Sequence, residues 1–101
     1  MKKMVLFPKG QNVLSTLGEN IKLARLRRKI STELMAERVG VSRATICSLE
    51  KGSASVSVGT YIQVLSVLGL EQDILQVALD DELGRKLQDA ELPVGKRAPK
   101  H

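Results

Sequence analysis

The chain has 101 residues, 43% of them hydrophobic, which is enough for one small domain with a buried core. Phe7 and Tyr61 are its only aromatic residues, so that core must be aliphatic. A single cysteine, Cys47, excludes an internal disulfide and a cysteine-based metal site, and the lone histidine, His101, argues against a histidine-based catalytic centre or metal cluster. No apolar run approaches the ~20 residues of a membrane span. The run at 4–7 is too short for a secretory signal, so we expect a cytoplasmic protein.

The net charge of +5 is distributed unevenly along the chain. Residues 1–52 carry eleven lysines and arginines against four acids, whereas residues 53–91 carry two against seven. Residues 92–101 add three more basic side chains. A basic face attracts nucleic acid of any sequence by neutralising phosphates and releasing counterions. The alternative is that the lysines and arginines only keep a small domain soluble.

The first predicted helix runs from about Ser15 to Lys29. Leu17, Ile21 and Ala24 recur at the spacing of one buried helical stripe. Basic residues crowd its last turns, where they complement the helix dipole whether or not they bind anything.

Two short helices follow in quick succession. Ser31 and Ser42 are suitable N-caps for them, and Gly40 and Gly52 can supply the left-handed residues that end them. Because so few residues separate the two helices, they must cross at a steep angle, which is the helix-turn-helix arrangement. The side chains expected to face the core are Met35, Ala36, Val39, Ile46 and Leu49.

A fourth helix is predicted from a cap at Ser57 to Gly69, with a wide apolar face. That face comprises Val58, Tyr61, Ile62, Val64, Leu65 and Leu68. A fifth helix is predicted to start near residues 71–73, with leucines every four residues at 75, 79, 83 and 87. The alternative is a break at residues 80–81, where two aspartates can cap a new short helix.

These elements divide the chain into four parts. We expect an N-terminal arm at 1–14, a helical domain at 15–79, a short C-terminal helix at 80–91 and a basic, disordered tail at 92–101. The arm is either irregular or contains a strand at 3–7 that pairs with a second copy. The tail could lie along phosphates, enter a minor groove or bind a protein partner.

The stretch LGENIKLARLRRKISTELMAERVGVSRATICSLEKG resembles the lambda-repressor/Cro-like, or XRE, helix-turn-helix family, and the resemblance extends over residues 17–79. It rests on linked features: Ala36, Gly40, Val41, Ser42, Ile46, Leu49, Glu50 and Gly52. The ending SVSVGTY…LGL…DDELGRKLQD, with its basic tail, more narrowly resembles HipB-type antitoxins, the partners of HipA-like kinase toxins. The resemblance implies an all-α, five-helix lambda-repressor-like fold.

The family resemblance also implies that residues 42–51 form the recognition helix, whose first turns contact base edges in the major groove. Arg43 is the strongest candidate for a base contact, because its planar guanidinium can donate to both N7 and O6 of guanine. The methyl groups of Ala44 and Thr45 suit contact with the methyl group of thymine. Thr32 stands where the family often has glutamine against the DNA backbone, and it is shorter. The candidate DNA-binding residues are Thr32, Ser42, Arg43, Ala44, Thr45, Cys47, Ser48 and Lys51.

Several of these residues have a simpler explanation. Arg43 could be a solvated residue at a helix start, and Cys47 a small filler beside the core. Lys51 satisfies the helix dipole with or without DNA, and Ser42 is a cap first. By resemblance, Arg25 and Glu50 form a structural ion pair, so Glu50 is not expected to be a catalytic acid.

We expect a two-fold dimer, as the resemblance implies, with Leu75, Leu79 and Leu83 as interface candidates; these leucines could instead only close the intramolecular core.

Three functions follow. The first is a transcriptional repressor and HipB-like antitoxin that binds operator DNA and a HipA-like kinase. The second is a stand-alone, phage-type regulator, and the third a protein-interaction module that needs no DNA. No nucleophile–base pair, paired-carboxylate site, phosphate loop or metal cluster can be assembled, so we expect neither an enzyme nor a cofactor.

Overall fold

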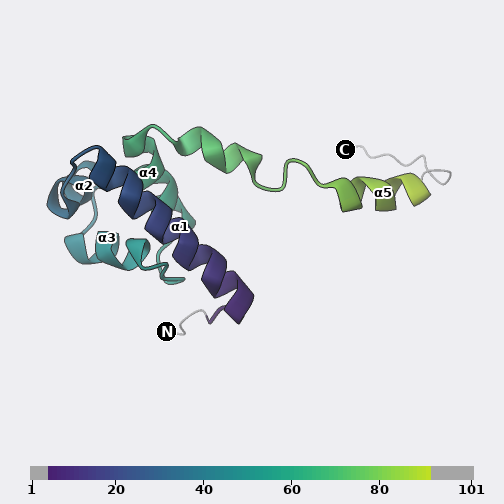
Figure 1. Cartoon of the computed structure of the whole chain (residues 1–101), viewed down its shortest axis with the longest axis horizontal. Coiled ribbons are helices and arrows are strands. Elements are labelled where there is room, and N and C mark those ends of the chain that lie inside the picture. Colours follow the sequence, from purple (N-terminus) through teal and green to yellow (C-terminus); the bar gives the residue numbers. More distant parts are fainter. Residues whose placement is uncertain (1–4, 92–101) are drawn as a thin grey trace.

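The computed structural model describes residues 5–91, and every regular element in that range is helical, which confirms the all-α prediction. The elements are α1 (Pro8–Arg27), α2 (Thr32–Val39), α3 (Arg43–Glu50), α4 (Val58–Leu68), the 3-10 helix η1 (Glu71–Gln76) and α5 (Glu82–Glu91). Helices α1 to α4 and η1 cluster together, while α5 extends away from them (Figure 1). The described chain is therefore elongated, with extents of 56 × 31 × 21 Å. None of its helices has both the length and the apolar character needed to cross a membrane.

The core lies between helices α1 to α4 and is aliphatic apart from Tyr61, whose hydroxyl donates to the carbonyl of Ser53 at 3.1 Å. Burial of Tyr61 raises the pKa of its phenol. Most side chains predicted to face inward do so, but Val58, the first residue of α4, is 69% exposed. The buried hydrophobic residues are Ile21, Ala24, Ile30, Met35, Ala36, Ile46, Leu49, Tyr61, Val64, Leu65 and Leu68.

The predicted helix caps are present. The hydroxyl oxygens of Ser31, Ser42 and Ser57 each accept from the backbone N–H three residues later, at 3.0, 3.1 and 3.2 Å. These bonds satisfy amides that have no partner inside a helix. Gly40 and Gly69 end α2 and α4 with φ of 87° and 78°, the left-handed region that a residue with a Cβ adopts only at a cost.

Helix α1 starts earlier than predicted. It begins at Pro8, whose fixed φ and missing N–H suit a first helical position. Ser15, the predicted start, lies inside the helix, and its hydroxyl accepts from the Gln11 amide at 3.0 Å. Residues 8–14 of the expected arm are therefore helical. Residues 5–7 form no strand in this chain, and residues 1–4 lie outside the described range.

The expected fifth helix is divided, as the alternative with a break at two aspartates predicts. The 3-10 helix η1 ends before Ala78, which has a left-handed φ of 63°. Asp81 then caps α5 by accepting from the backbone N–H of Gly84 at 3.1 Å. The leucine row at 75, 79, 83 and 87 consequently spans three segments, and its members are 60–68% exposed. The expected basic tail at 92–101 lies outside the described residues.

Helix α1 crosses the end of α3 at backbone contact distance, and two glycines make this possible. A Cβ on Gly18 would lie 2.6 Å from the carbonyl oxygen of Glu50 and 2.7 Å from that of Leu49. Gly52 combines a φ of 79° with an approach that would place a Cβ 2.6 Å from the Cα of Ser15. Such contacts leave no room for a side chain, so these glycines fix how closely α3 lies against α1.

We expect Gly18→Ala to lower the free energy of unfolding by about 1–3 kcal/mol, because the added methyl group forces two packed backbones apart. Gly59→Ala is the matched control: it lies in α4, and a Cβ there would come no closer than 3.7 Å to Ser57. Since alanine suits a helix interior better than glycine, Gly59→Ala should be neutral or stabilising. Urea unfolding followed by circular dichroism measures both, and equal effects of the two substitutions would contradict the close-packing argument.

Candidate nucleic-acid interface

Helices α2 and α3 form a helix-turn-helix unit in which three residues, 40–42, make the turn. Ile46 and Leu49 are fully buried and hold the inner face of α3 on the core. The capped start and the buried stripe together fix which face of α3 remains outside.

The outer face of α3 carries a ridge, defined here as Arg43, Ala44, Cys47, Ser48 and Lys51. All are exposed except Cys47, which is half-buried and has a free thiol. These positions share one side because 3.6 residues make a turn. The ridge contains two cations and no acid.

The other three candidate DNA-binding residues lie beside this ridge. Thr45 is half-buried, and its hydroxyl lies 2.9 Å from that of Ser42, so both hydroxyls belong to the cap of α3. The methyl group of Thr45 is therefore the more available part of its side chain. Thr32 begins α2, is half-buried and lies in the same groove as Cys47 and Lys51.

Two open grooves flank the ridge, and they differ in charge. The first, about 480 Å³, lies between α1, the start of α2 and α3, and is lined by Ser15, Glu19, Lys22, Arg25, Thr32, Cys47, Glu50 and Lys51. The second, about 450 Å³, lies between α3 and the start of α4. It is lined by Val41, Ala44, Thr45, Ser48, Ser53, Ser55, Val56, Ser57 and Thr60, none of them charged. This hydroxyl-rich wall was not among the sites predicted from the sequence, although SASVS at 53–57 is its signal.

Arg25 and Glu50 meet beneath the ridge in a two-pronged contact. Arg25 Nε donates to Glu50 Oε2 at 2.6 Å, and Arg25 Nη2 donates to Glu50 Oε1 at 3.0 Å. The remaining Nη1 donates to the carbonyl of Ile30 at 2.8 Å. Both side chains are 7% exposed, and the hydrogen bond to Glu50 raises the pKa of Arg25. Every polar side-chain atom buried within residues 5–91 has a partner.

A second ion pair lies on the surface, between the starts of the two helices. Arg43 Nε lies 3.1 Å from Glu33 Oε2, and the two side chains are 63% and 69% exposed. The other carboxylate oxygen of Glu33 accepts from the Thr32 hydroxyl at 3.2 Å. Hydrogen bonds from its own backbone N–H and from Thr32, with the nearby Arg43 charge, lower the pKa of Glu33. Glu33 was not among the site residues predicted from the sequence.

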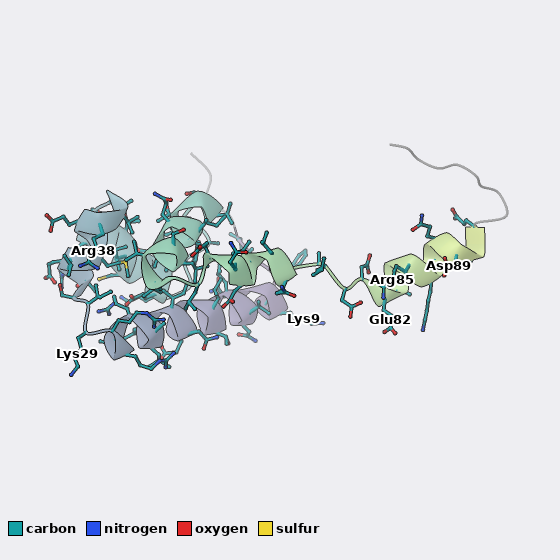
Figure 2. All side chains as sticks on the ribbon, turned by 90° about the horizontal axis from the view of Figure 1, so that it is seen from above. Lys9, Lys29, Arg38, Glu82, Arg85 and Asp89 are labelled. Carbon is teal, nitrogen blue, oxygen red and sulfur yellow. The ribbon has the colours of Figure 1, made fainter. Side chains whose placement is uncertain are left out.

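Side chains on α5 lie outside this region. Figure 2 shows Glu82, Arg85 and Asp89 on α5, away from the helix cluster that carries Lys29 and Arg38. The one ion pair found there joins Arg85 to Asp80 at 3.0 Å, and both groups are mostly exposed.

The model of a family described as a helix-turn-helix domain matches residues 16–77. The chain belongs to this helix-turn-helix family. The match runs from within α1 through η1 and contains every candidate DNA-binding residue. This helix-turn-helix protein is also 28% identical, over 80 residues, to the "Uncharacterized HTH-type transcriptional regulator YqaE" of Bacillus subtilis (strain 168). That alignment covers 73% of this chain and 69% of the relative.

We expect Glu50→Gln to lower the free energy of unfolding of this helix-turn-helix protein by about 3–5 kcal/mol, because it leaves the Arg25 charge buried without a counter-charge. Asp80→Asn removes the carboxylate of an exposed ion pair and serves as the control, since such pairs contribute little to stability. Thermal unfolding of the variants measures both effects. An unchanged melting temperature in Glu50→Gln would refute the structural role of the pair.

Proposed function

We propose that this protein is a transcriptional repressor that binds specific operator DNA through α3. The observation that carries the proposal is the ridge on α3: a short capped helix, fixed on its inner face, that presents Arg43 and Lys51 with no acid among them. The one acid of α3, Glu50, is buried and paired with Arg25, so it does not repel phosphates. Membership of the helix-turn-helix family supports this proposal.

The ridge offers few ways of reading bases. Arg43 is its strongest hydrogen-bonding group, and a two-pronged contact to guanine discriminates by about 1–3 kcal/mol. Ala44 and the Thr45 methyl group suit thymine methyls, and Ser48 can donate to or accept from a base. Cys47 and Lys51 on the ridge, and Ser42 and Thr32 beside it, are assigned to the DNA backbone or to close packing against it. Shape and deformability of the DNA must supply further specificity.

We expect Arg43→Ala to weaken binding to the DNA upstream of the protein's own gene by about five- to a hundredfold, with less effect on an unrelated duplex. Arg85→Ala removes the same charge from α5 and should leave both affinities nearly unchanged. Fluorescence anisotropy titrations at several salt concentrations measure these affinities. Wild-type protein that binds no duplex in a salt-dependent manner would exclude the DNA-binding function and favour a protein-interaction module.

We further propose that the protein acts as a homodimer through its C-terminal leucines. Leu75, Leu79 and Leu83 are 63%, 66% and 68% exposed, so the described chain itself does not cover them. Helix α5 has ten residues and none of them is buried. A helix this short is marginal in water unless its apolar side packs against something. A second copy of the chain supplies the same apolar surface.

We expect sedimentation equilibrium at micromolar concentration to give twice the chain mass. The double substitution Leu79→Asp with Leu83→Asp should give a monomer that keeps the helix-turn-helix fold, because neither side chain packs in the core. Lys86→Asp, an exposed change on the same helix, is the control and should remain dimeric. A monomeric wild-type protein would contradict this proposal.

The narrower proposal is that this repressor is a HipB-like antitoxin that also holds a HipA-like kinase toxin. Its support is the resemblance of the segment from α4 to α5 to those antitoxins, and the exposed apolar side of α5. A stand-alone regulator is the second candidate, and the name of the Bacillus relative, an HTH-type transcriptional regulator, fits both candidates. A kinase-like gene directly adjacent, whose product co-purifies with this protein, separates the two.

A further inference from the structure

We propose that Glu33 is a specificity-determining residue of this protein, one that positions Arg43 toward a base and away from the phosphate backbone. This inference rests on the DNA-binding function proposed above. It starts from the surface ion pair in which Glu33 Oε2 lies 3.1 Å from Arg43 Nε. Arg43 begins α3, and Glu33 lies in the first turn of α2, so the contact bridges the two helices of the helix-turn-helix unit.

The atoms involved in the contact suit a positioning role. Glu33 approaches Arg43 at Nε, the guanidinium nitrogen nearest the backbone. The two terminal amino groups of Arg43 lie beyond that nitrogen. They form the planar fork that matches the two acceptors on the major-groove edge of guanine. A carboxylate held at Nε therefore restricts where the two terminal amino groups of Arg43 point, and it leaves those amino groups available to contact a base.

Glu33 is itself held in place. Its Oε1 accepts from the Thr32 hydroxyl at 3.2 Å while Oε2 faces Arg43. A backbone hydrogen bond at Glu33, the Thr32 hydroxyl and the Arg43 charge lower the pKa of this carboxyl group, which favours the ionised form that pairs with Arg43. Thr32, Glu33 and Arg43 thus form a short chain of contacts across the surface that faces the DNA.

A carboxylate on a DNA-facing surface also has an electrostatic cost. It repels phosphates, so it weakens binding to duplexes of any sequence. It also competes with phosphates for Arg43, since the same guanidinium cannot pair fully with both. Glu33 is therefore expected to reduce non-specific affinity and to increase the preference for a guanine at the position that Arg43 reads.

Removing the charge of Glu33 should raise the affinity for non-specific DNA and lower the preference for the selected site. These two measured quantities change in opposite directions, so they can be tested together. Sites are first selected by the full-length protein from a random-sequence duplex library, and affinities are then measured for the selected duplex and for a shuffled duplex of equal composition. Glu33→Gln should bind the shuffled duplex about two- to fivefold more tightly, because one phosphate-repelling charge is lost. Its ratio of selected to shuffled affinity should fall about three- to tenfold.

Glu37→Gln is the matched control, since it removes an exposed carboxylate one turn later on the same helix. It should leave the affinity ratio unchanged. Thr32→Ala, which removes the group that holds Oε1, should lower the ratio in the same direction as Glu33→Gln but by less. Circular dichroism melting of each variant checks that the fold is retained, as expected for exposed and half-buried positions.

A double-mutant cycle assigns the effect to Arg43. In an Arg43→Ala background, Glu33→Gln should no longer change the affinity ratio, because the group that it positions is absent. A ratio that falls equally in both backgrounds overturns the inference. So does a Glu33→Gln variant that binds every duplex more tightly with its base preferences intact, since Glu33 then only repels phosphates. Wild-type protein that binds no duplex is a different outcome, which refutes the DNA-binding function itself.

Discussion

The guanidinium of Arg25 is the interaction on which the arrangement of the helix-turn-helix unit depends. It starts from α1, reaches the carbonyl of Ile30 ahead of α2, and holds Glu50 at the end of α3 with two hydrogen bonds. Three consecutive helices therefore meet at one charged group. Burying two ions costs free energy that only good geometry offsets, and removing one partner leaves the other charge buried without a counter-charge. The backbone contact at Gly18 fixes the same end of α3 sterically.

This arrangement also determines the charge of the exposed surface. An acid at position 50 can be tolerated next to DNA because it is buried and neutralised by Arg25. The ridge of α3 consequently carries cations alone, and the groove on its α4 side carries hydroxyl groups without charge. Of the exposed acids near the ridge, Glu33 is the one paired with Arg43. The two arginine–glutamate pairs thus differ in burial, and only the buried one joins α1 to α3.

How well the sequence predicts a feature depends on how far apart along the chain the residues that determine it lie. The caps at Ser31, Ser42 and Ser57 and the glycines after the helices act over three or four residues, and they set α2, α3 and α4 correctly. The start of α1 was misplaced, because the helix begins at Pro8 and not near Ser15. The space around Gly18 and the Glu33–Arg43 contact depend on how helices cross, which no local pattern contains. The ion pair of Arg25 and Glu50 was expected from family resemblance, not from spacing.

Few side chains on α3 are suited to contact bases, and this limits the sequence specificity that one copy of the protein can reach in the proposed binding mode. In the proposed DNA-binding mode, Arg43 is the one strong hydrogen-bonding group of the ridge, and a contact of that kind to a guanine discriminates by about 1–3 kcal/mol. Distinguishing an operator from the rest of a genome requires roughly 4–10 kcal/mol. A two-fold dimer doubles the contribution of each ridge and adds a fixed spacing between half-sites. The exposed leucines after η1 are the apolar surface available for such a dimer, so the segment farthest from the ridge bears directly on what the ridge can distinguish.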